Sequence, residues 1–110
     1  MANTYVSLKK KSDFQKTYKG KKLWGRFYVA YVLNNGLPFN RYALVASSKV
    51  GNAVVRNKLK RRSREIIRQK KDSVNTGFDV ILVLRKVAVD AQFGQMVLDI
   101  NNLFNKAGLF

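Results

Sequence analysis

The segment from residue 52 to residue 71 constrains the fold more than any other part of this chain. It contains neither proline nor glycine, and residues 56–71 include nine basic residues and a single acid. Asn52 is a suitable N-cap, and Gly51 permits a tight entry from the strand expected before it. The segment therefore predicts one continuous helix about 27 Å long, at a rise of 1.5 Å per residue.

The predicted helix has one cationic face and one apolar side. At about 100° per residue, Val55, Leu59 and Ile66 lie together and can pack on a sheet. The opposite arc comprises Asn57, Lys60, Arg61, Arg64, Arg68 and Lys71. Such a face is often merely solvated, but solvated faces normally mix signs because like charges four residues apart destabilise a helix. The nearly acid-free arc favours a phosphate-bearing partner.

Charge favours nucleic acid for the whole chain as well. The 110 residues contain 22 Lys and Arg, six Asp and Glu and no His, for a formal net charge of +16. A field of this size opposes the compact state unless a polyanion relieves it. An anionic membrane surface is the lesser alternative. Hydrophobic residues at 46% and aromatic residues at 12% indicate one folded domain over residues 1–110.

The same composition excludes several kinds of enzyme site. Without Cys or His the chain cannot form a zinc site, a disulfide, a thiol nucleophile or an imidazole base. The acids are scattered along the chain: Asp13, Glu65, Asp72, Asp79, Asp90 and Asp99. We therefore expect no catalytic residue and no metal-binding residue in the protein. No secretion signal or membrane-spanning run is evident, so a cytoplasmic protein without membrane contact is expected.

Elements before the basic helix are predicted from caps, turns and apolar runs. Residues 1–11 are expected to form a flexible basic leader. Ser12 and Gln15 have the spacing of a capping box, which predicts a short helix ending before Gly20. Strands are predicted over residues 26–33 and 42–47, with a turn between them. A shorter strand or turn near Leu23 and Trp24 is left open.

Two elements follow the basic helix. Residues 78–84 form a near-continuous apolar run, which indicates a strand covered on both faces. Beyond it, apolar residues recur at helical spacing, with Asp90 as the expected N-cap and Gly108 as the terminator. The resulting order is helix, strands, helix, strand, helix. This order predicts an α+β domain with a small, mainly antiparallel sheet.

The basic helix also carries a family resemblance. Residues 49–58 read KVGNAVVRNK and are followed by Lys60, Arg61 and Arg64. This pattern resembles the signature of bacterial ribonuclease P protein, Lys-x-Gly-x-Ala-Val-x-Arg-Asn-x-x-Lys-Arg-x-x-Arg. The resemblance extends over essentially the full length. One departure is Lys58, where the family usually has Arg, because Lys lacks the planar two-pronged donor of Arg.

The resemblance implies a particular fold and partner. The fold would be an α/β sandwich similar to the ribosomal protein S5 domain 2-like fold, with a left-handed crossover around the basic helix where general rules favour a right-handed one. The chain would be the protein subunit of an RNA-based endoribonuclease that removes the 5′ leader of precursor tRNA. Catalysis would belong to the ribonuclease P RNA and its magnesium ions, with no obligate protein partner.

The resemblance also implies two groups of site residues. The group expected to bind the catalytic RNA is Arg56, Asn57, Lys58, Lys60, Arg61, Arg64 and Arg68. The group expected to bind the leader is Phe14, Tyr18, Tyr31, Ser47 and Lys49. For Asn57 a local structural role is an alternative, and for the three aromatic residues core packing is one. Phe27, Trp24, Phe78 and Phe93 are assigned to packing or left open.

Other functional classes fit the sequence less well. A ribosomal or assembly protein that binds structured RNA would share the charge and the fold, but not the long ungapped signature. A DNA-binding regulator is disfavoured because no helix-turn-helix pair precedes the basic helix. An amphipathic membrane helix would bury bulky aromatic residues, which the apolar side of the basic helix lacks.

Overall fold

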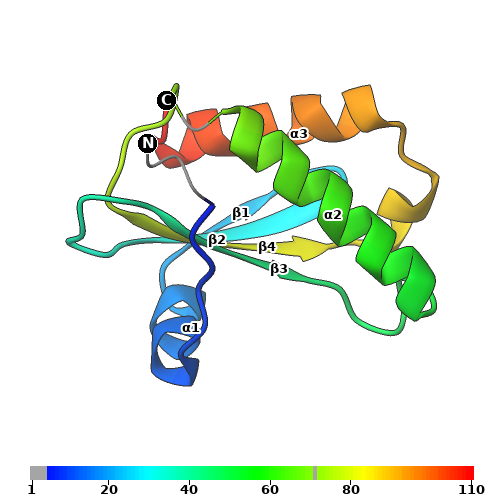
Figure 1. Ribbon diagram of the computed structural model, residues 1–110, viewed down its shortest axis with the longest axis horizontal. Helices are drawn as coiled ribbons and strands as arrows, with labels where there is room; N and C mark the ends of the chain where they lie inside the picture. The colour runs from blue at the N-terminus through cyan, green and yellow to red at the C-terminus, as the bar shows by residue number, and fades with distance from the viewer. Residues whose placement is uncertain (1–4, 71) are drawn as a thin grey trace.

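The computed structural model describes residues 5–70 and 72–110, which form one sheet flanked by helices (Figure 1). The elements are α1 (Lys11–Tyr18), β1 (Lys21–Trp24), β2 (Tyr28–Asn34), β3 (Arg41–Val45), α2 (Ala53–Gln69), β4 (Phe78–Leu84), the 3₁₀ helix η1 (Lys86–Asp90) and α3 (Phe93–Ala107). The sheet order is β1-β2-β4-β3, and only the β3–β4 pair is parallel. The expected α+β fold with a mainly antiparallel sheet is confirmed. Within the described ranges, no helix is long and apolar enough to span a membrane.

The sheet separates two unequal layers. Helices α2 and α3 cover one face, while α1 covers part of the other (Figure 1). Alternate residues of β2 and β4 serve the two sides: Tyr28 and Leu82 belong to the larger core, whereas Tyr31 and Ile81 belong to the α1 side. This alternation follows from the two-residue period of a strand. Strand β4 is therefore covered on both faces, as its apolar sequence predicts.

The connection between the two parallel strands determines where the basic helix lies. β3 and β4 are neighbours, and α2 connects them across the face shared with α3. Followed in Figure 1, the path from β3 through α2 to β4 is left-handed, as the family resemblance implies. Helix α2 consequently lies across the β3 side of the sheet, and no other helix or strand of residues 5–70 and 72–110 covers its outer face.

The start and the buried side of α2 agree closely with prediction. The Asn52 side chain accepts a hydrogen bond from the Val55 N–H at 3.0 Å, so Asn52 is the N-cap. Leu59 and Ile66 are buried as expected. Ser63 and Ile67 are buried too, which makes the packed side of the helix wider than its apolar residues alone suggest.

Two predicted helix starts are wrong. Helix α1 begins at Lys11, and its N-cap Lys10 makes no side-chain capping bond, so Ser12 lies inside the helix. Asp90 ends the 3₁₀ helix instead of starting α3. The cap of α3 is a reciprocal pair in which the Gln92 and Gln95 side chains each bond the other's backbone N–H. The extra 3₁₀ turn displaces the start of α3 along the chain. Gly108, with φ of 85°, terminates α3 as predicted.

The expected flexible leader is wrong for residues 5–11. Ser7 pairs with Tyr42 in a parallel bridge, and the Leu8 N–H donates to the Tyr42 carbonyl at 2.8 Å. The Tyr42 N–H donates in turn to the Val6 carbonyl at 2.8 Å. Leu8 is buried beneath α1. The segment therefore extends the sheet at the edge of β3, and residues 1–4 of the leader prediction lie outside the described residues.

Tyr28 makes stability depend on pH in the alkaline range. Its ring is fully buried and its hydroxyl lies 2.6 Å from the Ser63 hydroxyl. Burial raises the pKa of Tyr28 from 10 to about 12. The pKa of Tyr28 is higher in the folded than in the unfolded protein, so the neutral, buried phenol contributes to the free energy of unfolding. This contribution is complete below pH 10 and is lost as the pH rises through 12.

We expect Tyr28→Phe to flatten that dependence. Between pH 9 and 12 the free energy of unfolding of the variant should decrease by up to roughly 2–3 kcal/mol less than that of the wild type, since one pKa unit corresponds to about 1.4 kcal/mol. Urea unfolding followed by circular dichroism, at several pH values from 9 to 12, measures this for both proteins. Parallel pH profiles for the variant and the wild type would contradict the assignment.

Candidate RNA interface

The cationic face of α2 is open. Basic residues are distributed over nearly the whole length of the helix, and the described ones are exposed or half-buried. Its exposed members are Asn57, Lys58, Arg61 and Arg68, and its half-buried members are Arg56, Lys60 and Arg64. The structure thus places all seven sequence-predicted residues on one helix, and each is at least partly exposed. Lys71, also predicted for this arc, lies outside the described residues.

Two of these arginines converge on an aromatic residue that the sequence did not single out. The guanidinium carbons of Arg64 and Arg68 lie 5.9 and 5.7 Å from the centroid of the Tyr5 ring. Tyr5 itself stacks on Tyr42 at 5.5 Å between centroids. Burial raises the pKa of the Tyr5 phenol, so the ring is neutral and attracts the cations through its π face. Pairing of residues 6–8 with β3 is what brings Tyr5 there.

Arg56 differs from its neighbours on α2. Its Nε is buried and has no hydrogen-bond partner within the described part of the chain. A buried donor without a partner is costly, typically about 1–3 kcal/mol. An incoming acceptor such as a phosphate oxygen would remove that cost. Lys58, the departure from the family pattern, is exposed on the same turn.

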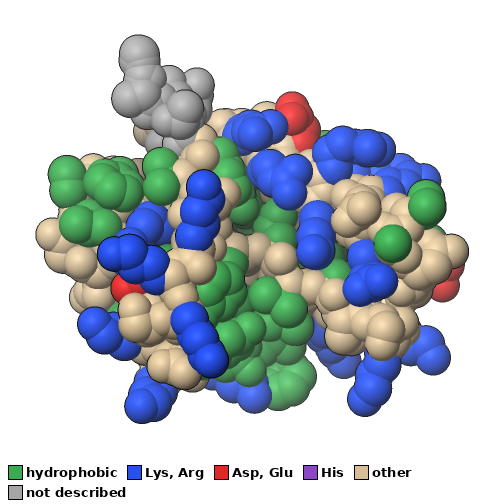
Figure 2. All heavy atoms as spheres, turned by 60° about the horizontal axis from the view of Figure 1, so that its bottom comes forward, with side chains coloured by type: hydrophobic (Ala, Val, Ile, Leu, Met, Phe, Trp, Pro, Cys, Tyr) green, Lys and Arg blue, Asp and Glu red, His purple; other side chains and the backbone are tan. Residues whose placement is uncertain are grey.

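Three predicted aromatic residues meet on the other side of the sheet. The Phe14 and Tyr18 rings of α1 are 6.4 Å apart, and Tyr18 meets Tyr31 of β2 edge-on at 4.8 Å. Tyr18 is 41% exposed, whereas Phe14 and Tyr31 are half-buried against the small core that includes Ile81. Packing and binding are therefore compatible for these rings. Figure 2 shows hydrophobic side chains bordered by Lys and Arg on this side of the molecule.

The aromatic surface continues onto β1, where sequence reasoning missed it. Lys22 lies opposite Tyr31 in the antiparallel register, and its Nζ is 5.6 Å from the Tyr31 ring. The same Nζ is 4.6 Å from the Trp24 ring. Trp24 is 62% exposed, the largest value among the exposed bulky hydrophobic residues apart from Val54 and Leu98. The prediction for Trp24 was open because only the strand register shows which side of the sheet it occupies.

Ser47 and Lys49 do not join the aromatic residues. Both are exposed in the connection between β3 and α2. Tyr31 is in register with Ile81, which pairs with Ala43. Ser47 is four residues beyond Ala43, or roughly 13 Å along an extended chain. The two polar residues therefore lie toward one end of the sheet face, at a distance from the rings.

The two surfaces approach each other at the edge of β3. A pocket of about 210 Å³ lies there, lined on one side by Phe14 of α1 and on the other by Lys60 and Arg64 of α2. Tyr5 and Tyr42 contribute to its walls. One or two segments of an extended ligand could therefore contact both the basic side chains of α2 and the aromatic rings at the β3 edge of the sheet.

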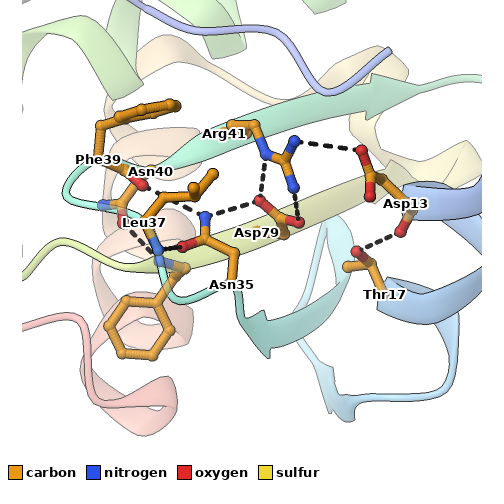
Figure 3. Close-up of polar contacts among 9 residues, drawn as sticks. Asp13, Thr17, Asn35, Leu37, Phe39, Asn40, Arg41 and Asp79 are labelled. Atoms are coloured by element: carbon orange, nitrogen blue, oxygen red, sulfur yellow. Dashed lines mark hydrogen bonds and ion pairs between the residues drawn. The ribbon is translucent and has the colours of Figure 1, made fainter. Parts of the chain in front are cut away.

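Two of the six acids take part in one ion network. Although scattered in sequence, Asp13 and Asp79 both bind Arg41, at 3.1 and 2.7 Å (Figure 3). Within residues 5–70 and 72–110, no three acidic, His or Cys side chains are grouped as metal ligands. The basic and aromatic side chains of this surface can neutralise charge, donate hydrogen bonds and stack.

Comparison with known proteins identifies the family of the chain. The family model described as Ribonuclease P matches residues 2–108. The chain belongs to the ribonuclease P protein family. A ribonuclease P protein component from Alkaliphilus oremlandii is 37% identical over 103 residues, covering 93% of this chain and 90% of the relative. One from a Thermoanaerobacter species is 36% identical over 111 residues, covering 100% and 96%.

Solved ribonuclease P proteins share the fold. The protein from Staphylococcus aureus superposes with a TM-score of 0.87 at 33% identity, covering 97% of this chain and 99% of that one. The protein from Thermotoga maritima gives a TM-score of 0.83 at 31% identity, covering 91% and 96%. The α+β architecture implied by the sequence resemblance is thereby confirmed as that of ribonuclease P proteins.

Proposed function

We propose that this chain is the protein subunit of a ribonuclease P ribonucleoprotein. In this proposal the α2 face binds the catalytic RNA, and the aromatic face beside α1 holds the 5′ leader of precursor tRNA. Cleavage releases the leader and leaves the mature tRNA 5′ end. The RNA partner and its magnesium ions perform the chemistry, and the protein supplies no catalytic side chain.

One observation carries the proposal: a single small domain presents two chemically different surfaces that meet at the β3 edge. The α2 face is rich in Arg and Lys, which suits the phosphates and 2′-hydroxyls of a structured RNA. The rings of Phe14, Tyr18 and Tyr31 beside Lys22 suit an unpaired strand, whose bases stack on aromatic side chains. Two RNA segments of different form are the ligands that fit both surfaces.

The mechanism follows from the charge. Bringing precursor tRNA to a catalytic RNA sets two polyanions against each other, and 22 basic residues against six acids reduce that repulsion. The leader is gripped at the same time by stacking, at about 1–3 kcal/mol for each stacked base. We therefore expect the protein to lower the magnesium concentration at which the RNA cleaves.

The test is cleavage of a 5′-extended precursor tRNA by a bacterial ribonuclease P RNA at low magnesium, with and without this protein. We expect the protein to switch on cleavage at the mature 5′ end. Binding of the RNA without an effect on cleavage would favour a ribosomal or assembly protein instead. Cleavage by the protein alone would overturn the division of labour proposed above.

Tyr18→Ala tests the leader surface separately. We expect affinity for precursor tRNA with a leader to fall about 5- to 100-fold, the equivalent of one lost stacking contact, with little change for mature tRNA. Phe39→Ala is the matched control, because Phe39 is 40% exposed but lies in the loop between β2 and β3. Equal losses for both variants, or for both RNAs, would argue against a leader contact at Tyr18. Equilibrium binding to the assembled holoenzyme measures each case.

A further inference from the structure

Trp24 occupies a place on the sheet that packing does not explain. It is the last residue of edge strand β1 and the only Trp in the chain, and 62% of it is exposed. In the register it lies opposite Val29, which pairs with Val83, and Val83 pairs with Val45. These residues form a row across the α1 side of the sheet, adjacent to the row that contains Tyr31. Trp24 stands at one end of this apolar row.

Two cations flank the Trp24 ring. The Lys22 Nζ lies 4.6 Å from its centroid and 5.6 Å from that of Tyr31, so one ammonium group links the two rings. The Arg85 guanidinium lies 5.9 Å from the Trp24 ring. The three rings of Phe14, Tyr18 and Tyr31 are therefore followed by Lys22, Trp24 and Arg85, so that cations and a further ring continue the aromatic surface. An unpaired RNA strand offers bases that stack on such rings and phosphates that pair with such cations.

The Trp24 end of this series is held in place by the turn between β1 and β2. Arg85 makes two hydrogen bonds to that turn: its Nη1 donates to the carbonyls of Gly25 and Arg26, at 3.0 Å each. The turn is fixed from the other side by Asp99 of α3. Its carboxylate accepts from the Arg26 and Phe27 N–H groups at 2.9 and 2.8 Å. Little ordering is therefore needed when a ligand arrives, which favours binding.

We propose that Trp24, with Lys22 and Arg85, is a further nucleotide-stacking site for single-stranded RNA. It extends the surface of Phe14, Tyr18 and Tyr31 toward β1, so that a longer part of the leader is bound. This inference rests on the proposed leader-binding function and names an additional site for it. A base would stack on the indole, while Lys22 and Arg85 would meet the phosphates on either side.

The test uses holoenzyme assembled from this protein and a bacterial ribonuclease P RNA. Precursor tRNAs with leaders from about one to about ten nucleotides are compared, a range that begins below the roughly 4–16 nucleotides that single-strand binding surfaces contact and extends into it. For Trp24→Ala we expect the affinity for precursor tRNA with a long leader to fall about 5- to 100-fold. The affinity of this variant should also stop rising at a shorter leader length than the affinity of the wild type. Trp24→Phe should recover part of the loss. Phe93→Ala, which removes an exposed ring of α3 instead, is the control.

Trp24 fluorescence gives a second measurement, because no other Trp contributes. We expect long leaders to quench this fluorescence. Leaders too short to reach Trp24 should leave it unchanged. If wild-type affinity rises with leader length and Trp24→Ala follows the same curve, this inference alone is overturned. If the wild type shows no dependence on leader length, the proposed leader binding fails too. Fluorescence that changes with protein concentration in the absence of RNA would assign Trp24 to a contact between copies of the chain.

Discussion

Replacing Arg61 and Arg64 together by alanine is expected to weaken binding of the ribonuclease P RNA roughly 100-fold at moderate salt. Both side chains belong to the cationic face of α2, where Arg61 is exposed and Arg64 half-buried. A hydrogen bond to a charged group contributes about 1.5–3 kcal/mol, and two contacts at the lower end of that range give this factor. The salt dependence should change with the affinity. Each lost phosphate contact lowers the slope of log affinity against log salt by about one, so the slope should fall by about two.

The matched control removes the same charge elsewhere. Lys86 and Lys106 are exposed, one in the 3₁₀ helix η1 and the other in the last turn of α3. Lys86→Ala with Lys106→Ala lowers the net charge by the same amount but leaves α2 intact. Affinity measured over a series of potassium chloride concentrations should therefore change much less for this pair. Equal weakening by both pairs would mean that diffuse charge attracts the RNA and that α2 has no privileged role.

Folding must be checked because Arg64 also contacts Tyr5. Thermal unfolding of the Arg61→Ala, Arg64→Ala double variant should remain cooperative, since neither side chain belongs to the core. Arg61→Ala alone has no Tyr5 contact to lose. It should still lower affinity by about 10-fold, the square root of the effect expected for the pair, if the two contacts are independent.

The parts of the structure that follow from local sequence were predictable. Helix α2 combines an N-cap at Asn52 with a periodic apolar side, and both signals depend only on residues within a few turns. Strand β4 likewise has an apolar run that matches its observed bounds, Phe78–Leu84. For α3 the periodic residues predicted the helix, but the start at Asp90 was wrong. A 3₁₀ turn occupies residues 86–90, and such a turn has no strong sequence pattern of its own.

The parts of the candidate site that join distant segments were not predictable in the same way. Lys22 and Trp24 reach the aromatic surface only through the β1–β2 register, in which Lys22 lies opposite Tyr31. A shift of one residue would move both to the opposite side of the sheet. Tyr5 reaches Arg64 because residues 6–8 pair with β3, which a basic leader sequence does not suggest. The family signature covers α2, and the remaining surface depends on tertiary pairing.

The Asp13–Arg41–Asp79 network is another product of tertiary pairing, and it connects stability to the proposed leader surface. Arg41 Nε and Nη2 donate to the two carboxylate oxygens of Asp79 at 2.8 and 2.7 Å, and Nη1 donates to Asp13 at 3.1 Å (Figure 3). The Asn35 amide donates to Asp79 at 2.8 Å. Asp13 belongs to α1, which carries Phe14 and Tyr18. The network therefore fixes α1 on β3 and β4.

We expect Asp79→Ala to lower the free energy of unfolding by about 3–5 kcal/mol, because Asp79 is buried and its loss leaves Arg41 and Asn35 without their acceptor. Asp13→Ala should cost about 1 kcal/mol, since it removes one hydrogen bond at a more exposed carboxylate. Replacing both members of the buried pair, Arg41→Met with Asp79→Leu, should recover much of the loss, because the only charge left without its partner is the more exposed Asp13 carboxylate. Urea unfolding measures all three. A recovered double variant that still binds the leader poorly would show that the network orients α1, whereas an Asp79→Ala loss below about 1 kcal/mol would contradict its structural role.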